Sequence, residues 1–291
     1  MKRKGPPVGF GEIRARGVLV WVRAGFSSLF DGAGSLRPAG AGGTAGTVVA
    51  YRGRAEMVRV PLGPAAGSCA LVRHYRRGGL FQRLLKDGYL GKGRFFREVS
   101  VTEEARVRGV PTVEVLAVRA QRVLPWVYRA DLVTREIQGA RDLQAYLASR
   151  SGGEKAWDRP ERVRVVSQVA GLVRRTHDAG LLHADLNLKN VLLRGTGQDL
   201  ECFVIDLDKA RILPGPVGHR GRMKNLLRLH RSLEKLGFAG GTVTLRDVIR
   251  FARVYSRGDR TLMRSIRNRI RKPRLSLRMH RFFWRLTGGR A

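Results

Sequence analysis

The sequence predicts an α+β protein of two lobes, the first rich in β-strands and the second helical. Short β-type runs separated by Gly and Pro dominate the first half, whereas apolar residues at helical spacing dominate from Gly139 onward. A length of 291 residues is enough for two lobes that share a cleft. We therefore expect a strand-rich lobe over residues 1–138 and a helical lobe over residues 139–291.

Three β-type runs are expected after a loop at residues 31–46 that is rich in Gly and Ala. The runs are Thr47–Tyr51, Met57–Leu62 and Cys69–Tyr75. Gly53 separates the first two, and further Gly residues separate the second from the third.

One helix and two more strands complete the predicted first lobe. The helix covers about Phe95–Arg108 and should end at Gly109-Val110-Pro111, because proline cannot continue it. Strands are expected at Val113–Val118 and Trp126–Thr134. Three strands, one helix and two strands is the order of a nucleotide-binding lobe of the protein-kinase kind.

The second half begins with a helix that is apolar over a broad arc and should be buried. One face of this helix contains Val166, Ala170, Val173 and His177, and it is widened by Val165, Val169 and Leu172. Gly180 is a suitable stop, and β-type runs follow at Val191–Leu193 and Phe203–Ile205. The remainder is helical and basic, with an apolar stripe of Leu226, Leu229, Leu233 and Leu236. Arg222, Lys224, Arg228, Arg231 and Lys235 are expected outside that stripe.

The charge balance favours an anionic partner. The chain has 57 Lys and Arg against 23 Asp and Glu, a formal net charge of +34, and residues 220–291 alone hold 21 Lys and Arg but 3 Asp and Glu. Nucleic acid, an anionic membrane surface and a polyanionic substrate all fit such a field. Cys69 and Cys202 fit no metal spacing, and the apolar run Gly17–Val22 is too short to span a membrane. We expect a cytoplasmic protein whose contact with a membrane is peripheral.

The segment His183–Asn190 carries the strongest chemical signal. It has His-x-Asp and then Asn five residues after the Asp, as in the catalytic loop of kinases. Asp185 would accept the proton of the acceptor hydroxyl and Asn190 would bind Mg²⁺, while Asp206, after the next β-type run, would be the second metal ligand. In the alternative interpretation Asp185 caps a helix and Asp206 lies in a polar turn. The helix, loop, hairpin and second Asp together favour an ATP- and Mg²⁺-dependent phosphotransferase.

A kinase site also needs a cation for the nucleotide phosphates, held by a helix carboxylate. Arg73 stands where Lys is usual, and Glu98 is the expected partner, with Glu103 and Glu104 as competitors. The alternative is that Arg73 is a surface strand residue. Gly53 lies where a loop would cover the phosphates, although an ordinary turn would equally favour Gly. Within the catalytic segment, Asn187 is a further candidate for nucleotide binding.

Five segments carry a resemblance to a known family. They are Leu71–Leu80, Gly109–Thr112, Tyr128–Thr134, His183–Asn190 and Ile205–Lys209. Over roughly residues 45–235 the chain resembles the lipopolysaccharide kinase family, the Kdo and core-heptose kinases of Gram-negative bacteria, and most of all its Kdo-kinase branch. The stretch Arg-His-Tyr-Arg-Arg-Gly-Gly from Arg73 is the most family-specific piece.

The resemblance implies transfer of the γ-phosphate of ATP to a sugar hydroxyl on the Kdo of a lipid A–core precursor, at the inner face of the inner membrane. It implies an Arg in place of the kinase Lys, which supports Arg73, and it matches Asp206-Leu207-Asp208. Gly53-Arg54-Ala55 departs from the Gly-x-Gly of the family. The basic C-terminal residues fit such an acceptor, since basic residues near an anionic leaflet contribute about 1 kcal/mol each. Arg278–Arg285 is expected either to anchor at the interface or to pack its aromatic residues into the core.

Other classes fit less well. A protein kinase is disfavoured because no Ala-Pro-Glu follows Asp206 and only 85 residues remain after it. Aminoglycoside- and choline-type kinases act on cationic acceptors, which a strongly basic chain would repel. A core-heptose kinase of the same fold stays open, as does a basic nucleic-acid-binding protein on a kinase-like scaffold.

Overall fold

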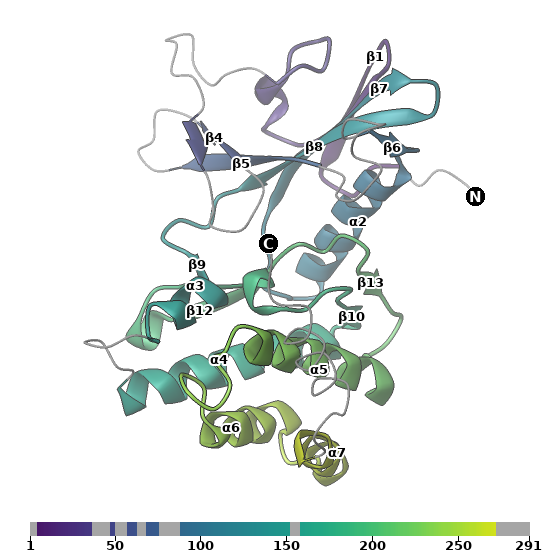
Figure 1. Cartoon of the computed structure of the whole chain (residues 1–291). Coiled ribbons are helices and arrows are strands. Elements are labelled where there is room, and N and C mark those ends of the chain that lie inside the picture. Colours follow the sequence, from purple (N-terminus) through teal and green to yellow (C-terminus); the bar gives the residue numbers. More distant parts are fainter. Residues whose placement is uncertain are drawn as a thin grey trace, which may run out of the picture.

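The computed structural model describes residues 5–36, 47–49, 57–62, 68–75, 88–151 and 158–271, which form a strand-rich lobe above a helical lobe (Figure 1). The candidate Gly53, the pair Arg76 and Arg77, and the segment Arg278–Arg285 lie outside these residues. The proposed division after residue 138 falls in the connection between strands β8 and β9.

The strand-rich lobe contains an eight-stranded antiparallel sheet in the order β1-β2-β7-β8-β5-β4-β3, with β6 paired to β8. Its strands are β1 (Phe10–Ala15), β2 (Val18–Arg23), β3 (Thr47–Val49), β4 (Met57–Pro61), β5 (Cys69–His74), β6 (Tyr89–Leu90), β7 (Val115–Leu124) and β8 (Val127–Arg135). A 3-10 turn, η1 (Ser27–Leu29), follows β2 and helix α2 (Gly93–Val107) follows β6.

Both faces of the central strand β7 are covered. Phe95 and Val99 of α2 pack against Val115 and Val118 on one face. On the other face, Leu29 and its neighbours pack against the side chains beside them on β7, Leu116 and Ala117. A strand buried on both faces has a continuous apolar sequence rather than an alternating one, which explains the run Val115–Val118.

The predicted order of three strands, one helix and two strands is present from β3 to β8, but the prediction was incomplete. It missed the hairpin β1–β2 and the short strand β6. The run Gly17–Val22, considered only as a membrane span, provides the Gly17 turn (φ 76°) and most of β2, which pairs with β7 from Val18 opposite Gln121. That partner lies about a hundred residues away, so local pattern gave no sign of the pairing.

The helical lobe is built on α4, which lies below α3 and β12 in Figure 1. Its helices are α3 (Leu143–Ala148), α4 (Arg159–Asp178), α5 (His219–Lys235), α6 (Leu245–Ser256) and α7 (Arg260–Arg271). Its short strands and 3-10 turns are β9 (Arg141–Asp142), β10 (Leu181–Leu182), η2 (Leu188–Asn190), β11 (Val191–Arg194), η3 (Gly197–Asp199), β12 (Glu201–Val204) and β13 (Arg211–Ile212). Within the described residues, no helix combines the length and the apolar character needed to cross a bilayer.

The buried face and the end of α4 were predicted correctly, and the helix begins at Arg159, before the predicted apolar positions. The Asp158 side chain caps α4 by accepting from the Glu161 N–H at 2.6 Å. The helix stops before Gly180 (φ 81°), where a Cβ atom would lie 2.6 Å from the Gly215 carbonyl oxygen and 2.7 Å from that of Leu213. Only Gly fits there without moving backbone.

One prediction about α5 was wrong. Arg222 was expected outside the apolar stripe, yet it is buried with 9% of its surface exposed. Its guanidinium donates to the Val217 carbonyl at 2.6 Å and to the Asp178 carboxylate at 2.7 Å. These acceptors satisfy the charge inside the lobe, as a buried Arg requires.

Candidate active site

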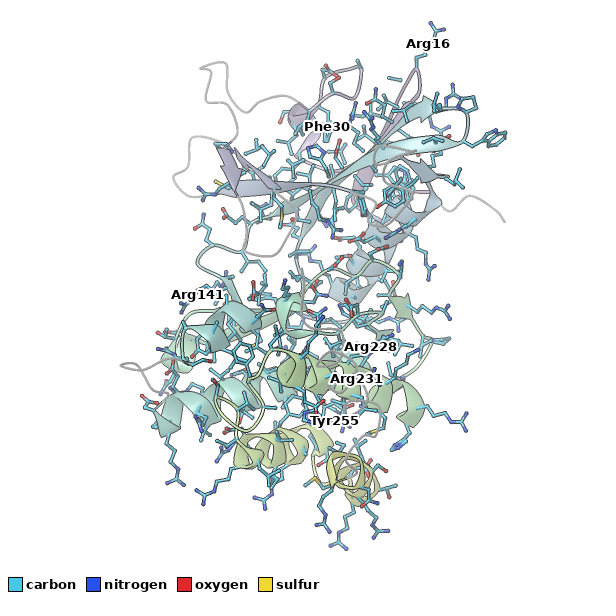
Figure 2. The ribbon with its side chains drawn as sticks, viewed as in Figure 1. Arg16, Phe30, Arg141, Arg228, Arg231 and Tyr255 are labelled. Atoms are coloured by element: carbon cyan, nitrogen blue, oxygen red, sulfur yellow. The ribbon has the colours of Figure 1, made fainter. Side chains whose placement is uncertain are left out.

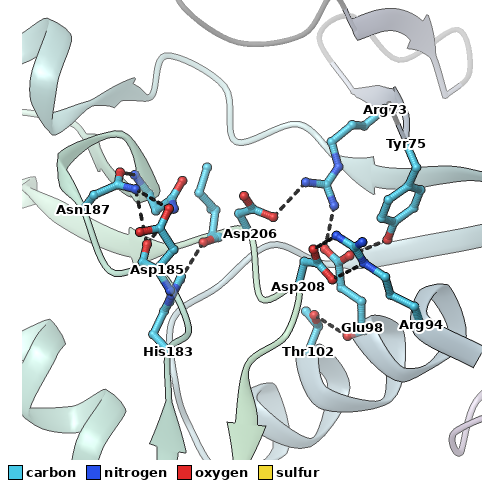
Figure 3. Close-up of polar contacts among 12 residues, drawn as sticks. Arg73, Tyr75, Arg94, Glu98, Thr102, His183, Asp185, Asn187, Asp206 and Asp208 are labelled. Carbon is cyan, nitrogen blue, oxygen red and sulfur yellow. Dashed lines mark hydrogen bonds and ion pairs between the residues drawn. The ribbon is translucent and has the colours of Figure 1, made fainter. Parts of the chain in front are cut away.

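The loop between β10 and β11 carries Asp185, which is exposed and lies on the same side of the helical lobe as Asp206 (Figure 3). Asn187 shapes this loop: its side-chain oxygen accepts from the backbone N–H of Lys189 at 2.9 Å and of Asn190 at 3.2 Å, which caps η2. Its amide nitrogen donates to Asp185 Oδ2 at 2.9 Å. All the contacts found for Asn187 are therefore within the loop, where it orients the Asp185 carboxylate.

His183 ties the Asp185 loop to the residue before Asp206. Its ring is fully buried; Nδ1 accepts from the Asp185 N–H at 3.0 Å and Nε2 donates to the Ile205 carbonyl at 3.0 Å. Burial lowers the pKa of His183, so the ring is neutral with its proton on Nε2. Two loops that carry predicted site residues are thus held together by one imidazole.

Arg73 on β5 brings the second group of predicted residues together. One guanidinium nitrogen donates to Glu98 Oε1 at 2.6 Å and the other to Asp206 Oδ1 at 2.9 Å (Figure 3). Glu98 is 3% exposed and also accepts from the Tyr75 hydroxyl. The competitors Glu103 and Glu104 pair instead with Arg23 and Arg108, so Glu98 is the partner.

Burial and neighbouring charges shift the pKa values of Arg73 and Glu98 in opposite directions. Burial raises the pKa of Glu98, against the effect of the Arg73 guanidinium. Burial would lower the pKa of Arg73, but the carboxylates of Glu98 and Asp206 raise it overall. The Arg73 guanidinium therefore stays charged and is held as a fixed cation between Glu98 and Asp206.

Asn190 lies beside Asp185, and Asp206 follows β12. The Asn190 amide nitrogen donates to the Asp185 carbonyl at 2.9 Å, and its backbone carbonyl accepts from the Ile205 N–H at 3.0 Å. Asp206 has a left-handed backbone (φ 61°), which is uncommon for Asp and typical of functional turns. The side chain that this backbone positions is 42% exposed and meets Arg73.

A second contact between the lobes was missed by sequence reasoning. Arg94, four residues before Glu98 on α2, donates through Nε to Asp208 Oδ1 at 2.8 Å and through a second nitrogen to the other oxygen (Figure 3). The helical spacing puts Arg94 and Glu98 on one face of α2. Two spacings in the sequence could have indicated this contact. Arg94 is one helical turn before Glu98, and Asp208 is two residues after Asp206.

A buried polar chain supports the loop that carries Asp185. Asn225 of α5 is fully buried; its amide nitrogen donates to the His183 carbonyl at 2.8 Å and its oxygen accepts from the His183 N–H at 3.3 Å. His177 Nε2 contacts the same oxygen at 3.1 Å, and Tyr255 of α6 contacts His177 Nδ1 at 2.7 Å. Arg228, three residues after Asn225, donates to the Ala184 carbonyl. Burial lowers the pKa of His177 to about 4, so this ring is neutral as well.

Comparison with known proteins places these features in one family. The model of the lipopolysaccharide kinase (Kdo/WaaP) family matches residues 57–255. A 3-deoxy-D-manno-octulosonic acid kinase of Haemophilus influenzae is 36% identical over 173 residues, 58% of this chain and 66% of the relative. Proteins of the same name are 33% identical over 168 residues in Mannheimia succiniciproducens (56% and 65%) and 32% over 173 in Pasteurella multocida (58% and 67%). The match with the first relative thus spans just under two thirds of that protein.

A solved structure, WaaP in complex with acyl carrier protein, has a TM-score of 0.52 and 22% identity over 77% of this chain and 87% of that chain. This similarity confirms the predicted two-lobed, kinase-like fold.

Proposed function

The chain belongs to the lipopolysaccharide kinase (Kdo/WaaP) family, and from this membership we propose that it transfers the γ-phosphate of ATP to a hydroxyl of Kdo in the lipid A–inner core of lipopolysaccharide. The observation that carries the proposal is the link through His183, which holds the Asp185 loop against the Asp206 turn while Arg73 reaches Asp206 from the other lobe. In this proposal the acceptor base, the metal ligands and the phosphate cation lie together where the two lobes meet, with residues 1–138 as the nucleotide lobe and residues 139–291 as the catalytic lobe.

Asp185 is proposed to orient the acceptor hydroxyl and take its proton. The hydrogen bond from Asn187 to Oδ2 restrains the carboxylate, so Oδ1 is the atom offered to the hydroxyl. A positioned carboxylate of this kind contributes about 10²–10⁴-fold to the rate. Asn187 acts through Asp185 in this account, in addition to the nucleotide contact that the sequence suggested.

Asn190 and Asp206 supply the kind of donors that Mg²⁺ prefers. Both offer oxygen, and because the Asn190 amide nitrogen donates to the Asp185 carbonyl, the amide oxygen is the atom that would bind a metal. Mg²⁺ in nucleotide sites takes one or two protein ligands and completes its shell with phosphates and water. When bound, Mg²⁺–ATP supplies the phosphoryl group and neutralises its charge. Arg73, anchored by Glu98, would pair with the phosphates.

The proposed acceptor rests on the names of the relatives and on the net charge of this chain. The curated relatives are named 3-deoxy-D-manno-octulosonic acid kinases, and a net charge of +34 suits an acceptor that carries carboxylates and phosphates. Such an acceptor lies in a membrane, so we propose a cytoplasmic enzyme that works at the inner face of the inner membrane. A core heptose is the second candidate acceptor.

The acceptor can be tested with purified lipids. The full-length chain is incubated with ATP and Mg²⁺ and with either Kdo-lipid A, lipid A lacking Kdo, or a heptose-containing core lipid, and products are examined by mass spectrometry. We expect one added phosphoryl group on Kdo-lipid A and none on lipid A alone. Transfer to the heptose-containing lipid without transfer to Kdo-lipid A would replace the acceptor, and transfer to none of them would reject the proposed function.

A further inference from the structure

An exposed apolar cluster lies at the end of the β7–β8 hairpin, outside the cleft. Eight large hydrophobic residues are exposed among the residues that the structure describes, and four of them lie at this tip or on the strand beside it. They are Leu90 (72% exposed), Val123 (38%), Leu124 (58%) and Trp126 (79%). Leu90 and Leu124 are both register partners of Val127, which brings β6 to the hairpin tip. Scattered exposed apolar residues are ordinary, whereas a cluster indicates a contact surface.

Trp126, at the tip of this hairpin, has a backbone conformation that is unfavourable for a bulky residue. β7 and β8 are joined by Pro125 and Trp126, and Trp126 has a left-handed backbone (φ 67°) that Gly or Asn usually provides. A bulky residue in that conformation costs stability, and with most of its surface exposed the Trp126 side chain recovers little of that cost by packing. Such strain is typical of functional positions.

Cations predominate around the cluster; the Glu12 carboxylate lies near one of them, Lys92. Arg122 and Arg129 are exposed on the two strands, Lys92 follows Leu90, and Arg16 in the neighbouring turn projects outward in Figure 2. The Arg122 N–H donates to the Gly17 carbonyl at 2.7 Å, which fixes that turn beside the tip. No Asp or Glu occurs in residues 15–20, 88–92 or 120–129.

We propose that this tip, defined as Leu90, Val123, Leu124 and Trp126 with its cationic rim, inserts into the interfacial region of an anionic lipid bilayer. Trp and Leu beside Arg and Lys is the composition of interfacial anchors, and the cations complement an anionic leaflet. A two-residue hairpin tip is convex and small, whereas a specific protein interface needs about 800 Å² on each partner. The inference deepens the proposed function, since it gives the enzyme a way to stay at the membrane that holds its acceptor.

The test is binding of the full chain to vesicles without ATP or acceptor. Vesicles of phosphatidylethanolamine with phosphatidylglycerol are compared with phosphatidylcholine vesicles by co-sedimentation at low and high salt. The variant is Leu90→Ser, Leu124→Ser, Trp126→Asn. Its matched control is Val107→Ser with Leu245→Ser, two exposed apolar residues elsewhere. We expect the tip variant to lose roughly tenfold or more in partitioning to anionic vesicles, most clearly at high salt, where purely electrostatic binding is screened, and the control to bind like the wild type.

Folding can be separated from binding, because Asn suits the backbone of residue 126 better than Trp does. The single variant Trp126→Asn should melt at or above the wild-type temperature while binding vesicles more weakly. Wild-type binding by the triple variant, or equal loss in the control, would overturn the proposal. So would a change of oligomeric state in the variant, which would make the tip a protein interface. If vesicle binding behaves as expected but the wild type phosphorylates no acceptor, the membrane contact stands and the proposed reaction fails.

Discussion

Arg73 donates to Asp206 across the two lobes at 2.9 Å while its other guanidinium nitrogen holds Glu98 at 2.6 Å. One side chain therefore connects the strand that would face the nucleotide, the helix that supports it and the turn that would bind metal. Arg can do this because its donors are fixed in a planar fork, which a Lys ammonium lacks.

Arg73→Lys tests this double contact. A single ammonium cannot keep both carboxylates and also serve a phosphate, so we expect kcat/KM for ATP to fall roughly tenfold to a hundredfold, mainly through KM. Steady-state kinetics with varied ATP measure the effect. Arg59→Lys is the matched control, because Arg59 on β4 pairs with Glu136, the residue after β8; a similar loss there would contradict a specific role for Arg73.

Asn225→Leu tests the support of the catalytic loop. The substitution removes the donor to the His183 carbonyl and the acceptor for its N–H, so the loop should lose its set position while the binding groups remain. We expect a fall in kcat of about tenfold or more with little change in either KM. Asn225→Asp keeps the acceptor and should recover part of kcat.

The control for a general loss of stability is Leu262→Ala, a truncation of a buried core side chain on α7. If it lowers the melting temperature as much as Asn225→Leu and also lowers kcat as much, Asn225 has no positioning role.

The neutral His177 predicts acid sensitivity. Its pKa of about 4 in the folded protein lies below the ordinary value of 6.5, so the unfolded chain binds the proton first and stability is fully present only above about pH 6.5. The contribution is lost as pH falls from there toward 4, on the order of 3 kcal/mol in total. Urea unfolding from pH 7.5 downward should show this slope, and His177→Gln should flatten it. Parallel slopes for the two proteins would contradict the assignment.

The Arg94–Asp208 contact should couple the lobes energetically. A double-mutant cycle with Arg94→Gln and Asp208→Asn is expected to give a coupling of about 0.5–3 kcal/mol in unfolding, since both groups belong to one contact. The same variants should lower kcat, because α2 also positions Glu98. Additive effects on stability would show that the two side chains do not depend on each other.

The features that were predicted from the sequence are those that depend on residues close together along the chain. Asp185, Asn190 and Asp206 follow from spacing along the chain, because one loop and one hairpin position them. Glu98 follows from the strand-then-helix order, and the structure separates it from Glu103 and Glu104 by the partners that each carboxylate meets.

The features that the sequence did not reveal depend on tertiary contacts. β1 and β2 are stabilised by pairing with β7, and the Asn225 contacts join α4, α5 and α6 to the catalytic loop. Arg222 was predicted to lie on the surface because helical periodicity cannot show that its guanidinium pairs with the Asp178 carboxylate of another helix.

The most direct measurement is the single-turnover rate of phosphoryl transfer from radiolabelled ATP to Kdo-lipid A, for the wild type and for Asp185→Asn. The substitution keeps the size of the side chain and removes its basic carboxylate. The account predicts a fall in rate of about 10²–10⁴-fold, with ATP affinity within a few-fold of the wild type. Transfer by Asp185→Asn at the wild-type rate would contradict it.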